Sequence, residues 1–109
     1  MKKVAYLITR SGTQELIGGC LLNTTSTGRQ GVQVVALHFC EDGVYHLVKG
    51  SKNAAKVARA MAEQGVKVIA CECSVGNRGL EDLLIEGVQI GHLADFFAAA
   101  AEADHVISL

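Results

Sequence analysis

Short apolar runs recur along the chain, and each is followed by a stretch with helical periodicity or turn-forming residues. The run 4–9 is continuous and contains β-branched residues, which is typical of a strand covered on both faces of a parallel sheet. Similar runs recur at 32–39 and 66–71, and shorter ones at 88–90 and 105–109. The pattern therefore predicts a strand at each of these places.

The first predicted helix begins at Ser11, an N-cap residue with Gln14 at the capping-box spacing. We expect its inner face to carry Leu16, Ile17, Cys20 and Leu21. Gly18 and Gly19 each cost such a helix about 1 kcal/mol relative to alanine. Their presence predicts close approach to a neighbouring backbone.

The second predicted helix starts after Ser51, another N-cap residue, and ends at Gly65 in the C′ position. Its apolar face is Ala54, Val57, Ala58, Met61 and Ala62. Beyond the third strand, segment 73–79 has the composition of a loop, and 80–85 is predicted as a short helix. Strands that alternate with helices favour crossover connections, so we predict one α/β domain over residues 1–109, with α/β/α layers around a five-stranded parallel sheet.

The third long helix is predicted over 92–103 and is apolar on nearly every side. Leu93, Phe96, Phe97 and the alanine run 98–101 leave few polar positions around its circumference. One face can pack on the sheet, and we expect the other to meet a second subunit. The alternative is that the weakly hydrophobic alanines face solvent.

Charge and composition exclude several functions. The 109 residues carry 10 basic and 11 acidic side chains, a net charge of −1, and half of them are hydrophobic. A near-neutral chain has no basic excess for direct nucleic-acid binding. No apolar run approaches the roughly 20 residues needed to cross a membrane. The first run is also too short for a signal-peptide core and is closed by Arg10, so we expect a cytoplasmic protein.

The four cysteines are expected to be free thiols, which suits a cytoplasmic protein. Cys71 and Cys73 are too close along a strand for ordinary disulfide geometry. We expect Cys20 to be a core residue. Cys40 precedes the acidic pair Glu41 and Asp42, which should raise its pKa and make it a weak nucleophile.

Cys71 is the strongest candidate for chemistry, because it ends a strand at the edge where open α/β sheets bind ligands. The segment that follows it, Gly76, Asn77, Arg78 and Gly79, offers flexible backbone N–H groups and one cation. A cation beside a thiol favours the thiolate, the nucleophilic form. Cys73 is a candidate second thiol. The alternative for Cys71 is a buried, inert cysteine.

Other polar residues give weaker signals. Metal binding would need His38, Cys40, His46, Cys71 and Cys73 to converge, but their spacing is not that of a zinc site, and we expect neither a metal nor another cofactor. His92 and Asp95, three residues apart on a helix, are expected to form a structural hydrogen-bonded pair.

Several segments together resemble a known family. They are Gly12–Gln14, Phe39–Tyr45, Cys71–Leu80, Leu84–Gly91 and Ala103–Ile107. They are similar to segments of the DsrE/DsrF/TusD sulfur-relay family, and most of all to its YchN-like members. The resemblance implies strand order 4-3-2-1-5, assembly into homotrimers or homohexamers, and a persulfide carried on Cys71. It places Cys73 one position away from the second cysteine of some members.

Three functions follow from these observations. The first is a cytoplasmic sulfur carrier, or sulfurtransferase subunit, that holds sulfane sulfur on Cys71 and passes it between donor and acceptor proteins. The second is an oligomeric scaffold or regulatory module in which Cys71 is inert. The third is a redox sensor that oxidises Cys71 together with Cys73.

Overall fold

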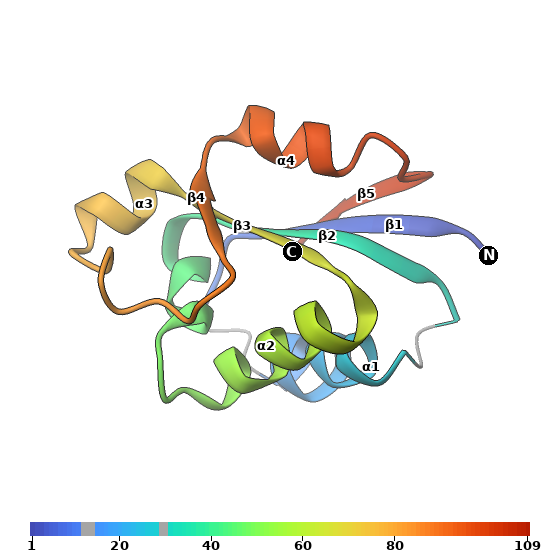
Figure 1. The fold of residues 1–109 in the computed structure, drawn as a ribbon, viewed down its shortest axis with the longest axis horizontal. Coiled ribbons are helices and arrows are strands. Elements are labelled where there is room, and N and C mark those ends of the chain that lie inside the picture. The colour runs from blue at the N-terminus through green and yellow to red at the C-terminus, as the bar shows by residue number, and fades with distance from the viewer. Residues whose placement is uncertain (12–14, 29–30) are drawn as a thin grey trace.

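The chain folds around a parallel sheet, shown by a computed structural model that describes residues 1–11, 15–28 and 31–109 (Figure 1). The strands are β1 (Lys3–Ile8), β2 (Gln33–Phe39), β3 (Lys67–Cys71), β4 (Gln89–Gly91) and β5 (His105–Ser108). The sheet has five strands in the order β4-β3-β2-β1-β5, and every neighbouring pair is parallel. Both the predicted fold class and the strand order are confirmed.

The helical segments lie on both faces of this sheet. They are a π-helical segment η1 (Glu15–Leu22) that continues into α1 (Asn23–Thr27), a 3₁₀ segment η2 (Glu41–Leu47), α2 (Lys52–Gln64), α3 (Glu72–Asn77) and α4 (Leu93–Ala99). Helices α1 and α2 lie on one face and α4 on the other (Figure 1). In the part of the chain that the structure describes, no helix is long and apolar enough to cross a membrane.

The two faces of the sheet have cores of different size. The larger core packs under α1 and α2 around fully buried residues such as Leu37, Phe39 and Val57. The smaller one lies under α4 and consists of Ala5, Ala36, Phe96 and Ala100. Two alanines on the strands let α4 approach closely and bury Phe96. One face of α4 therefore packs on the sheet, as its apolar sequence predicts.

The first helical segment differs from its prediction. Its turns are π-helical, which have i→i+5 rather than i→i+4 hydrogen bonds, so the buried positions shift. Ile17 and Leu21 are buried, whereas Leu16 and Cys20 are exposed, so the prediction of a core Cys20 is wrong. The predicted cap at Ser11 depends on Gln14, which lies outside the described residues.

The two glycines of this segment behave differently. A Cβ on Gly18 would collide with the side chain of Asn53 in α2, whereas one on Gly19 would meet open space. The carbonyl of Gly18 also accepts a hydrogen bond from Lys56 Nζ at 2.8 Å. Gly18 therefore makes room for the Asn53 side chain and not for the neighbouring backbone that was predicted, and the prediction is also wrong at Gly19.

Helix α2 has the predicted caps. The Ser51 hydroxyl accepts a hydrogen bond from the Ala54 N–H at 3.1 Å, and Gly65 ends the helix with a φ of 67°. Helix α4 ends at Ala99, four residues before the end of the predicted helix at 103, because the chain turns there towards β5.

Segment 73–79, predicted as a loop, instead forms most of α3 and its C-terminal turn. Ser74 and Val75 are buried against the rest of the molecule, and this packing outweighs the helix-breaking tendency of Gly76. Segment 80–85 is not a helix but a run of turns. Leu80 and Leu84 are buried, and Leu84 forms an antiparallel bridge with Val48.

Two buried histidines, His38 and His46, are expected to make the folded protein less stable in acid. Burial lowers the pKa of His38 and of His46, although hydrogen bonds to the carbonyls of Ile69 and Arg10 act in the opposite direction. His38 stacks on Phe96, with ring centroids 5.2 Å apart. An unfolded histidine takes up a proton near pH 6.5, so the unfolded state binds more protons than the native state as the pH falls.

We therefore expect the free energy of unfolding to decrease as the pH falls below about 6.5. Denaturant titrations at several pH values measure this slope. His38→Gln cannot titrate and should flatten it. An equal slope in wild type and His38→Gln would contradict the prediction.

Candidate functional site

The candidate site lies at the carboxyl edge of the sheet, where β3 gives way to α3 (Figure 1). Cys71 is both the last residue of β3 and the N-cap of α3, with an extended backbone at φ −63° and ψ 119°. On one side it pairs with Gly91 of β4, which has no side chain. The thiol is half-buried, so Cys71 is neither sealed in the core nor fully in solvent.

The surroundings of Cys71 favour its thiolate. Partial burial raises the pKa of the thiol, but the Ser74 hydroxyl and the backbone N–H groups of Ser74 and Cys73 together lower it by more. The carboxylate of Glu41 acts in the raising direction. These two N–H groups do not make a full cap hydrogen bond with the side chain of Cys71, the N-cap residue of α3. The net result is a pKa below that of an ordinary cysteine, which increases the nucleophilic fraction.

Ser74 is oriented for this role by a contact with the turn after β2. Its Oγ accepts a hydrogen bond from the Glu41 N–H at 2.8 Å. A hydroxyl can accept and donate at the same time, so its hydrogen stays available to the sulfur of Cys71. Glu41 adopts a left-handed backbone with φ 51°, which costs a non-glycine residue roughly 1 kcal/mol. The strained turn therefore directs the N–H that orients Ser74, a role that local sequence signals did not reveal.

Gly43 fixes the path of the same turn. A Cβ at this position would collide with the backbone carbonyl of Ile8 at the end of β1. A backbone atom cannot rotate away as a side chain can, so only glycine lets the turn approach β1 this closely. The turn that presents Glu41 is thus held against the sheet.

The Arg78 side chain contacts this turn rather than the Cys71 thiol. Its guanidinium donates hydrogen bonds to Asp42 Oδ1 at 2.9 and 3.2 Å and to the Ser74 carbonyl at 3.1 Å. The guanidinium also lies 6.0 Å from the centre of the Tyr45 ring. Arg78 therefore joins α3 to the η2 turn, and its predicted effect on the thiolate stays a prediction.

The rest of the predicted anion-binding segment lies at the far end of α3 from Cys71. Gly76 and Asn77 belong to the helix, and Gly79 follows it with φ 64°. The N–H groups of Arg78 and Gly79 donate to the carbonyls of Val75 and Gly76 at 3.2 Å. Anion binding by this segment stays a prediction, while the N–H groups of Cys73 and Ser74 are those that affect the thiol.

The Cys73 side chain lies on a different surface from the contact between Ser74 and Cys71. Its exposed side chain lines a shallow hollow of about 640 Å³ together with Glu72, Ile90 and His92. His92 Nε2 lies 2.8 Å from Glu72, and the His92 N–H donates to Asp95 Oδ2 at 2.8 Å. The predicted pairing of His92 with Asp95 is confirmed as the capping box of α4.

Cys40 is the thiol that the sheet places beside Cys71. Strands β2 and β3 pair in parallel with Phe39 opposite Ala70, so Cys40 and Cys71 occupy the next positions of this register. Burial raises the pKa of Cys40, and the charges of Cys71 and Glu41 raise it further. The predicted rise in the pKa of Cys40 is therefore right, although burial rather than the charge of the neighbouring carboxylate is the main cause.

In the described ranges, no three histidine, cysteine or carboxylate side chains gather as metal ligands.

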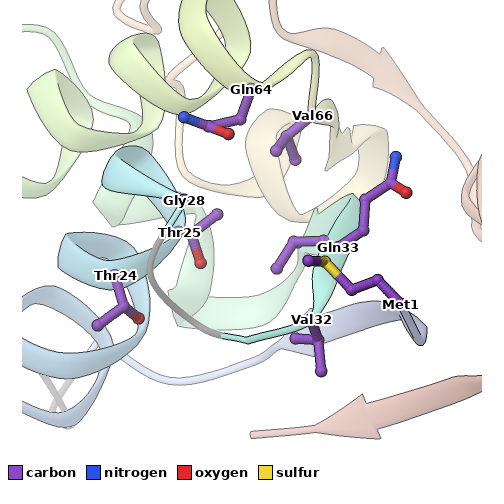
Figure 2. Close-up of a pocket in the computed structure, with 9 residues that line it drawn as sticks. Met1, Thr24, Thr25, Gly28, Val32, Gln33, Gln64 and Val66 are labelled. Atoms are coloured by element: carbon purple, nitrogen blue, oxygen red, sulfur yellow. The ribbon is translucent and has the colours of Figure 1, made fainter.

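A separate hollow of about 200 Å³ opens at the opposite edge of the sheet (Figure 2). Val32 and Val66, just before β2 and β3, line it with Thr25, Gly28 and Gln64. Because parallel strands place their amino ends together, this hollow is remote from Cys71 at their carboxyl ends.

Fold and site together define a small parallel α/β domain with a half-buried cysteine at the end of its third strand. The family model of the DsrE/DsrF-like family matches residues 2–109. The chain therefore belongs to the DsrE/DsrF-like family. No curated protein matches it.

Solved structures share the whole fold. The YchN protein from E. coli is 22% identical, with a TM-score of 0.75 and 100% coverage of both chains. MTH1491 from Methanobacterium thermoautotrophicum, a protein of unknown function, is 19% identical with a TM-score of 0.70, over 98% of this chain and 99% of that one. BT1422 from Bacteroides thetaiotaomicron, also of unknown function, is 14% identical with a TM-score of 0.72, over 99% and 95%. At these identities the likeness concerns the fold.

Proposed function

We propose that this protein is a cytoplasmic sulfur carrier that holds sulfane sulfur as a persulfide on Cys71. The single observation that carries the proposal is the half-buried Cys71 thiol, whose pKa is lowered by the Ser74 hydroxyl and two backbone N–H groups against the effect of burial. Membership of the DsrE/DsrF-like family supports a role related to sulfur relay. The partners in this role are a sulfur donor protein and an acceptor protein.

The transfer needs little beyond an accessible thiolate. The Cys71 thiolate attacks the outer sulfur of a donor persulfide, R–S–SH. A new S–S bond forms at Cys71 while the donor's S–S bond breaks, and the donor leaves as the thiolate R–S⁻. An acceptor thiolate then attacks the outer sulfur of Cys71–S–SH in the same way and releases the Cys71 thiolate. Ser74 and the N–H groups stabilise the anion before attack and after release.

Sulfur loading tests this function. The protein is mixed with a small persulfide, alkylated at once to trap bound sulfur, digested and analysed by mass spectrometry. We expect the Cys71 peptide to gain the mass of one sulfur atom. A Cys71 peptide that gains nothing, with slow alkylation of Cys71 in the native protein, would support the inert scaffold instead.

We further propose that the chain assembles with itself as a trimer or hexamer. Leu93 and Phe97 lie one turn apart on α4 and are 47% and 56% exposed, and Ile90 on β4 is 42% exposed. Large apolar side chains this exposed favour an interface. Ile90 also lines the hollow beside α3, so a second subunit on this surface would border the site region.

Light scattering tests the assembly. We expect wild type to have at least about three times the molar mass of one chain, and Phe97→Asp to fall towards the mass of a monomer because a buried carboxylate would be unpaired. Leu83→Asp is the matched control, since Leu83 is a similarly exposed leucine in a turn away from α4. Wild type with the mass of one chain would contradict self-association.

A further inference from the structure

Cys40 and Cys71 form a pair of thiols across two adjacent strands. Each lies one step beyond the last register pair of β2 and β3, Phe39 with Ala70. Neighbouring strands lie about 4.8 Å apart, and disulfides form across Cα separations of about 4.4–6.8 Å. The separation that the sheet sets between these two residues is thus within the range that a disulfide can bridge.

The two side chains are also directed to the same face of the sheet. Phe39 and Ala70 both belong to the core under α1 and α2. Side chains alternate along an extended strand, and both Cys40 and Cys71 keep extended backbones, with φ of −137° and −63°. Both thiols are therefore directed away from that core. Both are also half-buried rather than sealed.

We propose that Cys40 is the resolving thiol of Cys71: it attacks the Cys71 sulfur when that sulfur is bonded to a second sulfur, and closes a Cys40–Cys71 disulfide. On a Cys71 persulfide, an outcome that rests on the proposed function, this reaction discharges the stored sulfur as hydrosulfide. The chain would thereby empty itself when no acceptor protein arrives.

The reaction balances without an external oxidant. Cys71–S–S⁻ and Cys40–SH give Cys71–S–S–Cys40 and HS⁻. The new bond joins the two cysteine sulfurs, and the bond between Cys71 and the outer sulfur breaks. The leaving sulfur takes the bonding electron pair and the proton of Cys40, so the outer sulfur is reduced and the Cys40 sulfur is oxidised.

The inner sulfur is the atom that Cys40 can reach, because the inner sulfur is the Cys71 Sγ itself. Cys73 does not share this position, since it is on α3 and lines the hollow with Glu72 and His92. The pKa of Cys40 is raised in part by the charge of Cys71. Cys40 therefore holds the proton that the leaving hydrosulfide takes up.

The first experiment tests the pair without persulfide. A Cys20→Ser/Cys73→Ser chain, which retains Cys40 and Cys71, is mixed with one equivalent of the aromatic disulfide 5,5′-dithiobis(2-nitrobenzoate). We expect about two equivalents of thionitrobenzoate to be released, one on loading Cys71 and one on closure by Cys40. The same chain with Cys40→Ser should release about one equivalent and retain the mixed disulfide.

The second experiment follows bound sulfur after loading with a small persulfide. We expect the Cys71 adduct to last at least about tenfold longer in Cys40→Ser than in wild type, because an adjacent thiol has a high effective concentration. Wild type should release hydrosulfide and lose the mass of two hydrogens, in a peptide that joins Cys40 to Cys71. Cys40→Ala provides a second variant if Cys40→Ser unfolds, and circular dichroism checks both.

The two proposals fail separately. If Cys40→Ser leaves both the thionitrobenzoate yield and the lifetime of the adduct unchanged, the resolving role is overturned while sulfur carriage stands. If Cys71 takes no sulfur in any variant but the aromatic disulfide still gives two equivalents through Cys40, sulfur carriage is overturned while the resolving pair stands.

Discussion

Cys71→Ser is expected to abolish sulfur loading completely. The bound sulfur is attached to the Cys71 Sγ, and a serine hydroxyl is far too weakly acidic to be a nucleophile at neutral pH. The variant should fold normally, because Cys71 is only half-buried and oxygen is the smaller atom. Mass spectrometry after treatment with a small persulfide measures the loss.

The matched control is Cys20→Ser, which removes an exposed thiol from η1. Loading of this variant should equal that of wild type. An equal amount of sulfur on wild type and Cys71→Ser, with the adduct found on the Cys20 or Cys73 peptide, would show that exposed thiols react without selection and that Cys71 has no special role.

Ser74→Ala is expected to slow alkylation of Cys71 at neutral pH by about tenfold, since a hydrogen bond to a charged group contributes roughly 1.5–3 kcal/mol and two N–H donors remain. The variant also leaves the Glu41 N–H without the Oγ that accepts it at 2.8 Å. The rate of reaction with iodoacetamide as a function of pH measures the effect. The midpoint of the profile should move to higher pH, because the thiolate loses a donor that lowers its pKa.

Ser26→Ala is the matched control for this variant. Ser26 is buried, and its hydroxyl donates to the Asn23 carbonyl at 3.0 Å within α1. Helix α1 lies near the amino ends of the strands, at the opposite edge of the sheet from Cys71. Any general effect of removing a buried hydroxyl should appear in both variants. If Ser74→Ala and Ser26→Ala gave the same pH profile as wild type, the hydroxyl of Ser74 would have no part in activating the thiol.

Much of the fold could be predicted because its strands are encoded locally. Short, mostly apolar runs bounded by turn residues, such as 66–71, favour a buried parallel strand, and β3 occupies Lys67–Cys71. Ser51 and Gly65 mark the ends of α2 because capping depends on neighbouring backbone groups. The position of Cys71 at a strand end followed directly from these boundaries.

Other parts depend on contacts between distant residues. Helix α3 has the composition of a loop, and it forms where Ser74 meets the Glu41 N–H, 33 residues away. The exposure of Leu16 and Cys20 beside the buried Ile17 and Leu21 depends on a π-helical geometry that an ordinary helical period does not predict. The closeness of Cys40 to Cys71 depends on the register between β2 and β3. The sequence contained one signal for it, since Cys71 ends one predicted strand and Cys40 directly follows another.

The central claim is that Cys71 is an accessible cysteine with a lowered pKa. The most direct measurement is the rate of Cys71 alkylation against pH, in a folded chain whose other cysteines, Cys20, Cys40 and Cys73, are replaced by serine. The structure predicts reaction with a midpoint below that of an ordinary thiol, near 8.5 in peptides. A midpoint at or above that of a peptide cysteine, or a thiol that reacts only after unfolding, would contradict it.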